Sequence, residues 1–289
     1  MNEDILSLLE YKMPTFSKGQ RRIAVLIREN YDKTAFLTAS QLGKQAGVSE
    51  STVVRFAMEL GYDGYPQMQK AMQETVLNTL SSMQRMGVAQ DRMGNRDIIS
   101  TVLQNDAELL RQTVQSVERA DFEKAVNALL SAKNIYIVGI RSAAAMASFL
   151  GYYLQHMLDR VHVITHTDCG MLLEQMIHVQ AGDAVLAFSF PRHCTATLEA
   201  VAYCRSAGAT VIGITNSSLS PLTEFCDCLL LAKTDMVSVV DSLVAPMSLV
   251  NALIVALAAE KEDTLRSRLE KLETIWKSHN VYEKNGENL

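Results

Sequence analysis

The sequence predicts an α plus α/β chain: an all-helical N-terminal domain, then a C-terminal domain with a doubly wound, five-stranded parallel sheet. Two observations predict this arrangement. Apolar residues recur at the helical period through the first part of the chain, and from Lys133 onward short buried runs alternate with helical segments. Strands that are separated by helices pair in parallel and are covered on both faces of the sheet.

The composition is typical of a globular protein. The chain has 289 residues, 48% of them hydrophobic and 20% charged, which is enough for two domains. No apolar run reaches the roughly 18–20 residues that a membrane span needs. The N-terminus is acidic and lacks the apolar core of a signal peptide. We therefore expect a cytoplasmic protein with no membrane partner.

The cysteines argue against a metal site. Their number is odd and no export signal precedes them, so we expect reduced thiols. The pair at positions 226 and 228 lacks a second Cys or His pair at zinc spacing. The sequence therefore predicts neither a metal nor another cofactor. The five cysteines are Cys169, Cys194, Cys204, Cys226 and Cys228.

The formal net charge of −5 is unevenly distributed. Residues 1–77 hold nine basic and nine acidic side chains, so the remainder carries the whole excess, with 18 basic and 23 acidic. Residues 11–44 alone have seven basic and two acidic side chains. A local basic patch of this kind neutralises phosphates even in an acidic protein. The net charge therefore does not exclude a nucleic-acid partner.

Residues 38–65 have the pattern of a helix-turn-helix. Residues 39–46 are periodic as a short helix, and Gly47 supplies the positive φ of a tight turn. Ser49 is placed to cap the next helix, about residues 50–60. The helical period predicts that this second helix buries a stripe of Val53, Val54, Ala57 and Leu60.

The opposite face of that second helix is polar. Ser51, Thr52 and Arg55 face outward near its N-terminal end, where a recognition helix reaches base edges and phosphates. The alternative interpretation is an ordinary helical hairpin without a ligand.

Further candidate contacts flank the motif. Ser17 is placed to cap a helix of about residues 18–30, whose cations either contact phosphate or form a solvated face. In the turn at residues 62–66 we expect Tyr62 to pack, whereas Tyr65 either packs or lays its hydroxyl on a phosphate. The expected DNA-contacting residues are Lys18, Arg21, Arg22, Lys44, Ser49, Ser51, Thr52, Arg55 and Tyr65.

Three stretches carry a family resemblance: residues 16–24 (FSKGQRRIA), the helix-turn-helix itself, and residues 60–65 (LGYDGY). Together they resemble the N-terminal domain of RpiR-type bacterial transcriptional regulators, over about residues 1–76. The resemblance implies that this domain binds a double-stranded DNA operator.

The sequence divides into a helix-turn-helix domain at residues 1–80, a linker at 81–104, an α/β domain at 105–280 and a frayed tail at 281–289. Residues 84–97 mix Gly, Asn and charge without periodicity, which is typical of a linker. Amphipathic helices follow at about 98–117, overlapping the end of this linker span, and at 121–132, the second with Asp121 as its cap.

The α/β domain is predicted to have strands at residues 135–140, 161–165, 183–189, 210–215 and 227–231. Helical segments separate them, and a long apolar helix and a charged helix end the domain. In an open parallel sheet the ligand crevice lies beyond the carboxyl ends of the strands. The first strand is followed by small residues and Ser142, which favours an anion at a helix N-terminus. A GxGxxG motif is absent, so a dinucleotide is disfavoured.

The loops after the first, third and fourth strands resemble those of the sugar isomerase (SIS) domain, over about residues 105–262. In that family, a first-loop serine and an S-x-S-G-x-T loop bind the phosphate of a phosphosugar. Ser142 and Ser189 match two of these positions. Pro191, Arg192 and Cys194 stand where the second serine, the glycine and the threonine would be.

These departures leave the ligand class open between a sugar phosphate and another acidic metabolite. The guanidinium of Arg192 replaces lost hydroxyl donors as a holder of an anionic group. The expected effector-binding residues are Ser142, Ser189, Arg192, His193, Cys194 and Thr195. His193 and Cys194 adjoin each other, but no third orienting group is evident, so we do not expect a nucleophile and base pair.

The two resemblances imply a non-enzymatic transcriptional regulator in which a homodimer or tetramer binds DNA and a small anionic metabolite controls that binding. An aldose–ketose isomerase is the alternative. It needs a base, and Glu174 and His193 are the nearby candidates. A third possibility is an interaction module that has lost its ligand.

Overall fold

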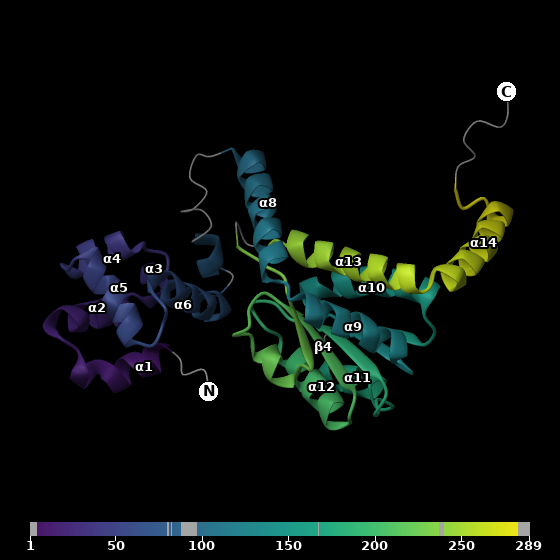
Figure 1. Cartoon of the computed structure of the whole chain (residues 1–289), viewed down its shortest axis with the longest axis horizontal. Helices are drawn as coiled ribbons and strands as arrows, with labels where there is room; N and C mark the ends of the chain where they lie inside the picture. The colour runs from purple at the N-terminus through teal and green to yellow at the C-terminus, as the bar shows by residue number, and fades with distance from the viewer. Residues whose placement is uncertain are drawn as a thin grey trace. The chain divides into compact units, whose positions relative to one another are not determined.

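The computed structural model describes residues 5–79, 81, 83–87, 97–166, 168–236 and 240–282. The chain divides into two compact units, Met1–Arg92 and Met93–Leu289 (Figure 1). The first is helical and the second is built on a parallel sheet, so the predicted fold class is confirmed.

The N-terminal unit packs its helices around one core. Ser17 and Gln20 form a reciprocal capping box at the start of α2, and Thr38 and Gln41 form another at the start of α4. Leu9, Ile23, Ile27, Leu42, Phe56, Met68 and Met72 are fully buried. The helices are α1 (Ile5–Lys12), α2 (Lys18–Glu29), α3 (Tyr31–Thr34), α4 (Ala39–Ala46), α5 (Glu50–Glu59) and α6 (Tyr65–Thr79), with a 3₁₀ turn η1 at Met13–Thr15.

The buried stripe of α5 differs from the predicted one. Val53, Ala57 and Leu60 are buried as expected, but Val54 is half-buried and Phe56 is fully buried. Phe56 lies 5.2 Å from Phe16, ring centroid to centroid, so an aromatic contact with the preceding segment draws this side chain inward.

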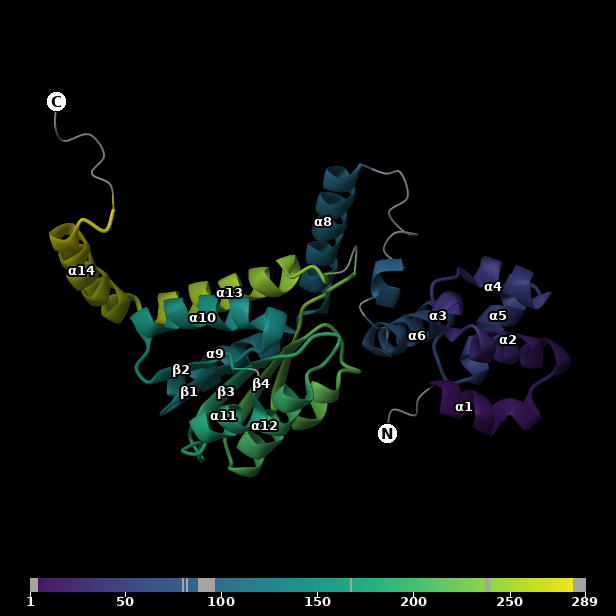
Figure 2. The ribbon, with the colours of Figure 1, turned by 180° about the vertical axis from the view of Figure 1, so that it is seen from behind.

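The C-terminal unit has a five-stranded sheet of order β2-β1-β3-β4-β5 in which every neighbouring pair is parallel (Figure 2). The chain adds β2 on one side of β1 and β3 on the other, so the switch point lies between β1 and β3. The strands are β1 (Ile135–Val138), β2 (Val161–Ile164), β3 (Ala184–Phe188), β4 (Thr210–Thr215) and β5 (Cys228–Leu231).

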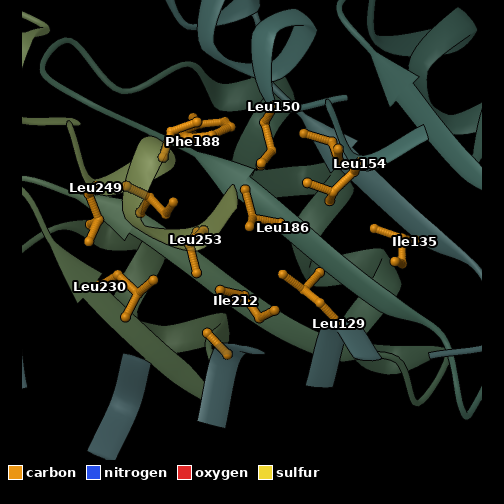
Figure 3. Close-up of a cluster of buried hydrophobic side chains, with 14 of the residues drawn as sticks. Leu129, Ile135, Leu150, Leu154, Leu186, Phe188, Ile212, Leu230, Leu249 and Leu253 are labelled. Atoms are coloured by element: carbon orange, nitrogen blue, oxygen red, sulfur yellow. The ribbon is translucent and has the colours of Figure 1, made fainter. Parts of the chain in front are cut away.

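Helices cover both faces of this sheet. One face packs against α9 (Arg119–Ser131), α10 (Ala144–Met157) and α13 (Val244–Glu260), and the other against α11 (Cys169–Gln175) and α12 (Thr195–Ser206). Figure 3 shows the first face, where side chains of the sheet meet leucines of the three helices. The remaining elements are α8 (Ile98–Ser116), α14 (Glu262–His279) and two 3₁₀ turns, η2 (Arg141–Ala143) and η3 (Pro221–Phe225).

The helix predicted at about residues 98–117 is confirmed as α8, and the Asp97 carboxylate starts it by accepting from the Ser100 backbone N–H. Its first residues overlap the predicted linker at 81–104, and residues 83–87 of that span are also helical. The rest of that linker lies largely outside the described residues. Asp121 is not a cap, because α9 already begins at Arg119. In the predicted tail, Tyr282 contacts the Trp276 ring, and residues 283–289 are outside the described part.

No single helix among the described residues has both the length and the apolar character of a membrane span; α13 and α14 meet these criteria only jointly, across a 98° bend.

Candidate functional site

The turn of the helix-turn-helix is fixed by backbone and side-chain contacts. Gly47 has a φ of 66°, the left-handed conformation that ends α4, and the Val48 N–H donates to the Gly43 carbonyl at 2.8 Å. The Arg22 Nη2 donates to the Gly47 carbonyl at 2.9 Å. Arg22, a predicted phosphate contact, therefore ties α2 to the turn, which leaves its other N–H groups for a ligand.

The N-terminal end of α5 is exposed and polar, as expected for a recognition helix. The Ser49 Oγ accepts from the Thr52 backbone N–H at 3.3 Å and lies 2.9 Å from the hydroxyls of both Ser51 and Thr52. The Arg55 Nε donates to the Ser51 carbonyl at 3.3 Å. Ser49 is thus the helix cap, while Ser51 and Arg55 present exposed side chains.

A surface hollow of about 560 Å³ lies between α2 and α4. Lys18, Arg21 and Arg22 contribute to its walls together with apolar side chains, Gln45 and Glu29. A second hollow of about 470 Å³ is lined by Ser17, Gln20, Thr52, Arg55, Met58 and Glu59. Lys18, Arg21 and Lys44 are exposed, so their ammonium and guanidinium groups are accessible to phosphate.

Tyr65 is a correction to the predicted DNA contacts. Its side chain is 3% exposed, and its hydroxyl donates to the Leu37 carbonyl at 2.6 Å. Burial raises the pKa of the phenol to about 12. Tyr65 therefore packs under the motif, where no phosphate reaches it, and Tyr62 is half-buried against the same core, as the sequence predicted.

The loop after β1 turns tightly against α10. A Cβ at Gly139 would lie 2.5 Å from the Ala143 carbonyl oxygen and 2.7 Å from the Ala147 Cβ, so only glycine permits this approach. The next residues form η2, where Arg141 adopts a φ of 59°. A non-glycine residue in this left-handed region costs about 1–2 kcal/mol. Arg141 and Ser142 are both exposed.

The loop after β3 is held by a buried hydrogen bond. Ser189 is 4% exposed, and its hydroxyl lies 2.9 Å from the His193 Nδ1. Burial lowers the pKa of His193 from 6.5 to about 4, so the ring is neutral near pH 7. The Ser189 hydroxyl is therefore engaged with this ring, and its role in effector binding stays a prediction.

Other predicted residues of this loop are more accessible. Arg192 is exposed, Cys194 occupies the N-cap position of α12 without a side-chain capping bond, and Thr195 is exposed in the first turn. Arg141 directly precedes Ser142, but it is not among the residues that the sequence predicts to bind an effector. Its positive φ is a property of the backbone and gives no signal in a single sequence.

The two residues considered as bases for an isomerase have different surroundings. Glu174 is exposed on α11, whereas His193 is tied to Ser189. Within the described part of the chain, no group of three or more His, Cys, Asp or Glu side chains is arranged to hold a metal ion.

Comparisons with known proteins match each unit to a domain model. The model of the rpiR-family helix-turn-helix domain matches residues 3–79, and the SIS domain model matches residues 128–256. The HTH-type transcriptional regulator HexR of Pseudomonas aeruginosa is 24% identical over 224 residues, covering 77% of this chain and 76% of HexR.

Solved structures agree in fold. The sugar isomerase domain of an RpiR transcription factor from Sphaerobacter thermophilus has a TM-score of 0.59 and 27% identity, over 62% of this chain and 99% of that one. Vibrio vulnificus NanR, complexed with ManNAc-6P, has a TM-score of 0.58 and 22% identity, over 94% of this chain and 97% of that one. With an rpiR-type helix-turn-helix preceding a SIS domain, the chain belongs to the RpiR family of transcriptional regulators.

Proposed function

We propose that this regulator binds its operator through the N-terminal end of α5 and the basic residues beside it, and that a sugar phosphate or related anionic metabolite in the SIS crevice controls that binding. The main observation in support of effector binding is the position of Arg192. This residue has an exposed guanidinium at the carboxyl end of β3, next to the sheet's switch point.

The arrangement of side chains on α5, α2 and α4 supports the proposed DNA contacts. Ser51, Thr52 and Arg55 are grouped at the start of α5, and Lys18, Arg21 and Lys44 are exposed on the two helices that pack with it. Base contacts from the first group would specify the site, and phosphate contacts from the second would position the unit.

The groups around Arg192 support the proposed binding of an anionic effector. Arg192 precedes α12, and a helix N-terminus presents free backbone N–H groups to an anion. Thr195 adds an exposed hydroxyl in the same turn. Because NanR is complexed with a phosphorylated sugar and shares this fold, a phosphosugar is the first ligand class to test.

We further propose that α13 and α10 pair two copies of the chain. α13 carries no charged side chain from Val244 to Ala259, yet Val255 is 68% exposed. Tyr152, on the neighbouring α10, is 53% exposed. An uncharged, exposed helix face with adjacent aromatic residues is typical of a homodimer interface. Val255→Glu is expected to dissociate the dimer in sedimentation, whereas Ser267→Glu on exposed α14 is not.

The isomerase alternative has less support. A neutral His193 whose pKa is about 4 is a weak base near pH 7, and its Nδ1 is engaged with Ser189. We therefore propose a sensor without catalytic turnover. Conversion of an aldose phosphate to its ketose by the purified protein, lost in His193→Gln, would favour the enzyme instead.

The test compares two charge-matched variants. Arg55→Ala and Lys70→Ala each remove one exposed cation from the N-terminal unit, but only Arg55 lies on α5. Arg55→Ala is expected to weaken binding to operator DNA by about tenfold or more at fixed salt, and Lys70→Ala by much less. Equal losses would mean that only net charge matters and would remove α5 as the recognition helix.

The effector half is tested by a thermal-shift screen. Sugar phosphates and their unphosphorylated counterparts are compared on the wild type and on Arg192→Gln. A ligand at about 100 times its Kd stabilises by about 2.7 kcal/mol, a shift of several degrees that the variant is expected to lose. An equal shift in both proteins would place the ligand elsewhere.

A further inference from the structure

We propose that the SIS crevice holds a ligand with two anionic groups, one on Arg141 and one on Arg192, and that the effector class is therefore a phosphorylated sugar acid. The inference rests on the proposed function, because it assumes that an anionic sugar binds in this crevice. It goes further by assigning a second anion site to Arg141, on a different loop from the residues that the sequence singled out around Arg192.

The two arginines lie in loops at the same end of the sheet, the carboxyl end of the strands. β1 and β3 are hydrogen-bonded neighbours in parallel, and Val138 pairs with Ala187 near their carboxyl ends. Arg141 follows Val138 by three positions and Arg192 follows Ala187 by five. Both loops therefore leave the sheet side by side, on either side of the switch point, where a ligand in an open α/β sheet contacts both.

Neither guanidinium has a protein partner in the part of the chain that the structure describes. Both side chains are exposed, and no carboxylate or carbonyl among the described residues accepts from them. Four other arginines of this unit are paired: Arg111 with Glu108, Arg205 with Asp227, Arg266 with Glu262, and Arg268 with Asp159. Arg160 is exposed and also has a positive φ, but it precedes β2 and so lies at the opposite end of the sheet. Each of the two guanidinium groups, of Arg141 and Arg192, therefore has parallel N–H donors that match the oxygens of a carboxylate or a phosphate.

The backbone of Arg141 is a separate observation. Its φ of 59° lies in the region that glycine adopts freely and long side chains rarely adopt. Strained residues of this kind cluster at ligand sites, where the side chain or the loop shape is used. An arginine at a glycine-like position beside the exposed Ser142 is accounted for if its guanidinium binds ligand.

The two sites differ in chemistry. Arg192 precedes the 12-residue helix α12, whose N-terminus and Thr195 hydroxyl suit a phosphate. Arg141 begins the short turn η2 and is followed by Ser142, and its guanidinium suits a carboxylate. A sugar phosphate without a carboxylate would fill one site and leave Arg141 unpaired.

The experiment measures Kd by calorimetry for ligand pairs in which a carboxylate replaces the aldehyde carbon: glucose 6-phosphate against 6-phosphogluconate, and glyceraldehyde 3-phosphate against 3-phosphoglycerate. The full-length wild type is compared with Arg141→Gly, Arg141→Lys and Arg192→Gln. In at least one pair the wild type is expected to prefer the acid by about tenfold to a hundredfold, the factor for one charge-assisted contact.

Arg141→Gly separates ligand binding from structure, because glycine relaxes the positive φ while removing the guanidinium. It is expected to retain or raise the Tm, to abolish the preference for the acid, and to bind the sugar phosphate as the wild type does. Arg141→Lys keeps the charge and is expected to keep part of the preference. Arg192→Gln is expected to weaken both members of the pair.

The outcomes distinguish this inference from the proposed function. If the wild type binds both members of every pair equally, or if Arg141→Gly keeps the preference, the second anion site is overturned and the sugar-phosphate sensor stands. If no member of any pair binds the wild type, both the second site and the effector half of the proposed function are overturned.

Discussion

At the scale of single residues, Tyr65 has a structural role, although the sequence placed it among the expected DNA contacts. The Tyr65 hydroxyl donates to the Leu37 carbonyl, which also accepts from Gln69 Nε2 at 2.6 Å. Tyr65→Phe is therefore expected to lower the free energy of unfolding by about 0.5–1.5 kcal/mol, because one buried hydrogen bond is lost. Urea denaturation followed by circular dichroism measures this loss.

The same variant is expected to bind operator DNA as the wild type does, since the Tyr65 side chain is buried. Arg55→Ala is the matched contrast, with unchanged stability and weakened binding. Weaker DNA binding by Tyr65→Phe at unchanged stability would return Tyr65 to the DNA contacts that the sequence suggested.

His193 makes the stability of the C-terminal unit depend on pH. Its pKa is about 4 in the folded chain because of burial, and near 6.5 when exposed. Between these values the unfolded chain binds more protons than the folded one, so stability falls as the pH drops from about 6.5 to about 4. Above pH 7 this contribution is complete and constant.

His193→Gln provides the measurement, because glutamine does not titrate. Urea denaturation followed by circular dichroism, repeated from pH 8 to pH 4, gives the stability of both proteins. The stability of the wild type relative to the variant is expected to decrease steadily below pH 6.5. A pH-independent difference would show that His193 titrates normally in the folded protein.

At the scale of elements, the start of α5 combines a structural cap with a proposed DNA surface. Ser49→Ala removes the cap of this helix and is expected to cost about 1 kcal/mol in stability. Ser49→Asp keeps the cap, since Asp caps as well as Ser, but adds a negative charge beside the phosphates. We expect wild-type stability and weaker DNA binding.

Ser49→Asn is the control for that pair, because asparagine caps without a charge. It is expected to match the wild type in stability and to bind DNA more tightly than Ser49→Asp in an electrophoretic mobility assay. If Asp and Asn bind DNA equally, the N-terminal end of α5 does not face the phosphates.

Local patterns predicted these elements well and long-range contacts poorly. Gly47 and Ser49 act within one turn of the chain, and their roles as helix end and cap are confirmed. Burial of Phe56 depends on Phe16, forty positions earlier. The contact between Ser189 and His193 is local in sequence, but it depends on how the loop after β3 folds. The order of the strands and the positive φ of Arg141 likewise follow from tertiary packing, which one sequence does not reveal.

At the scale of the whole molecule, regulation requires that the two units be energetically coupled. The residues proposed to contact DNA and those proposed to bind the effector lie in separate compact units of the chain. A metabolite changes DNA affinity only by binding the DNA-competent and DNA-incompetent arrangements of the protein with different affinities. A dimer provides such arrangements, since two recognition helices must match two half-sites at a fixed spacing.

This coupling is expected to be reciprocal. If a bound metabolite changes the operator Kd by some factor, saturating operator must change the metabolite Kd by the same factor and in the same direction, typically about 5- to 150-fold. Anisotropy of labelled operator gives the first factor, and calorimetry with and without operator gives the second. Arg192→Gln is expected to abolish the change in DNA affinity while leaving binding of the free protein to operator intact, and Arg55→Ala to weaken DNA binding while leaving metabolite affinity intact. Unequal factors in the wild type would mean that the metabolite acts at a second site or changes the oligomeric state, because a single linked equilibrium allows only one coupling free energy.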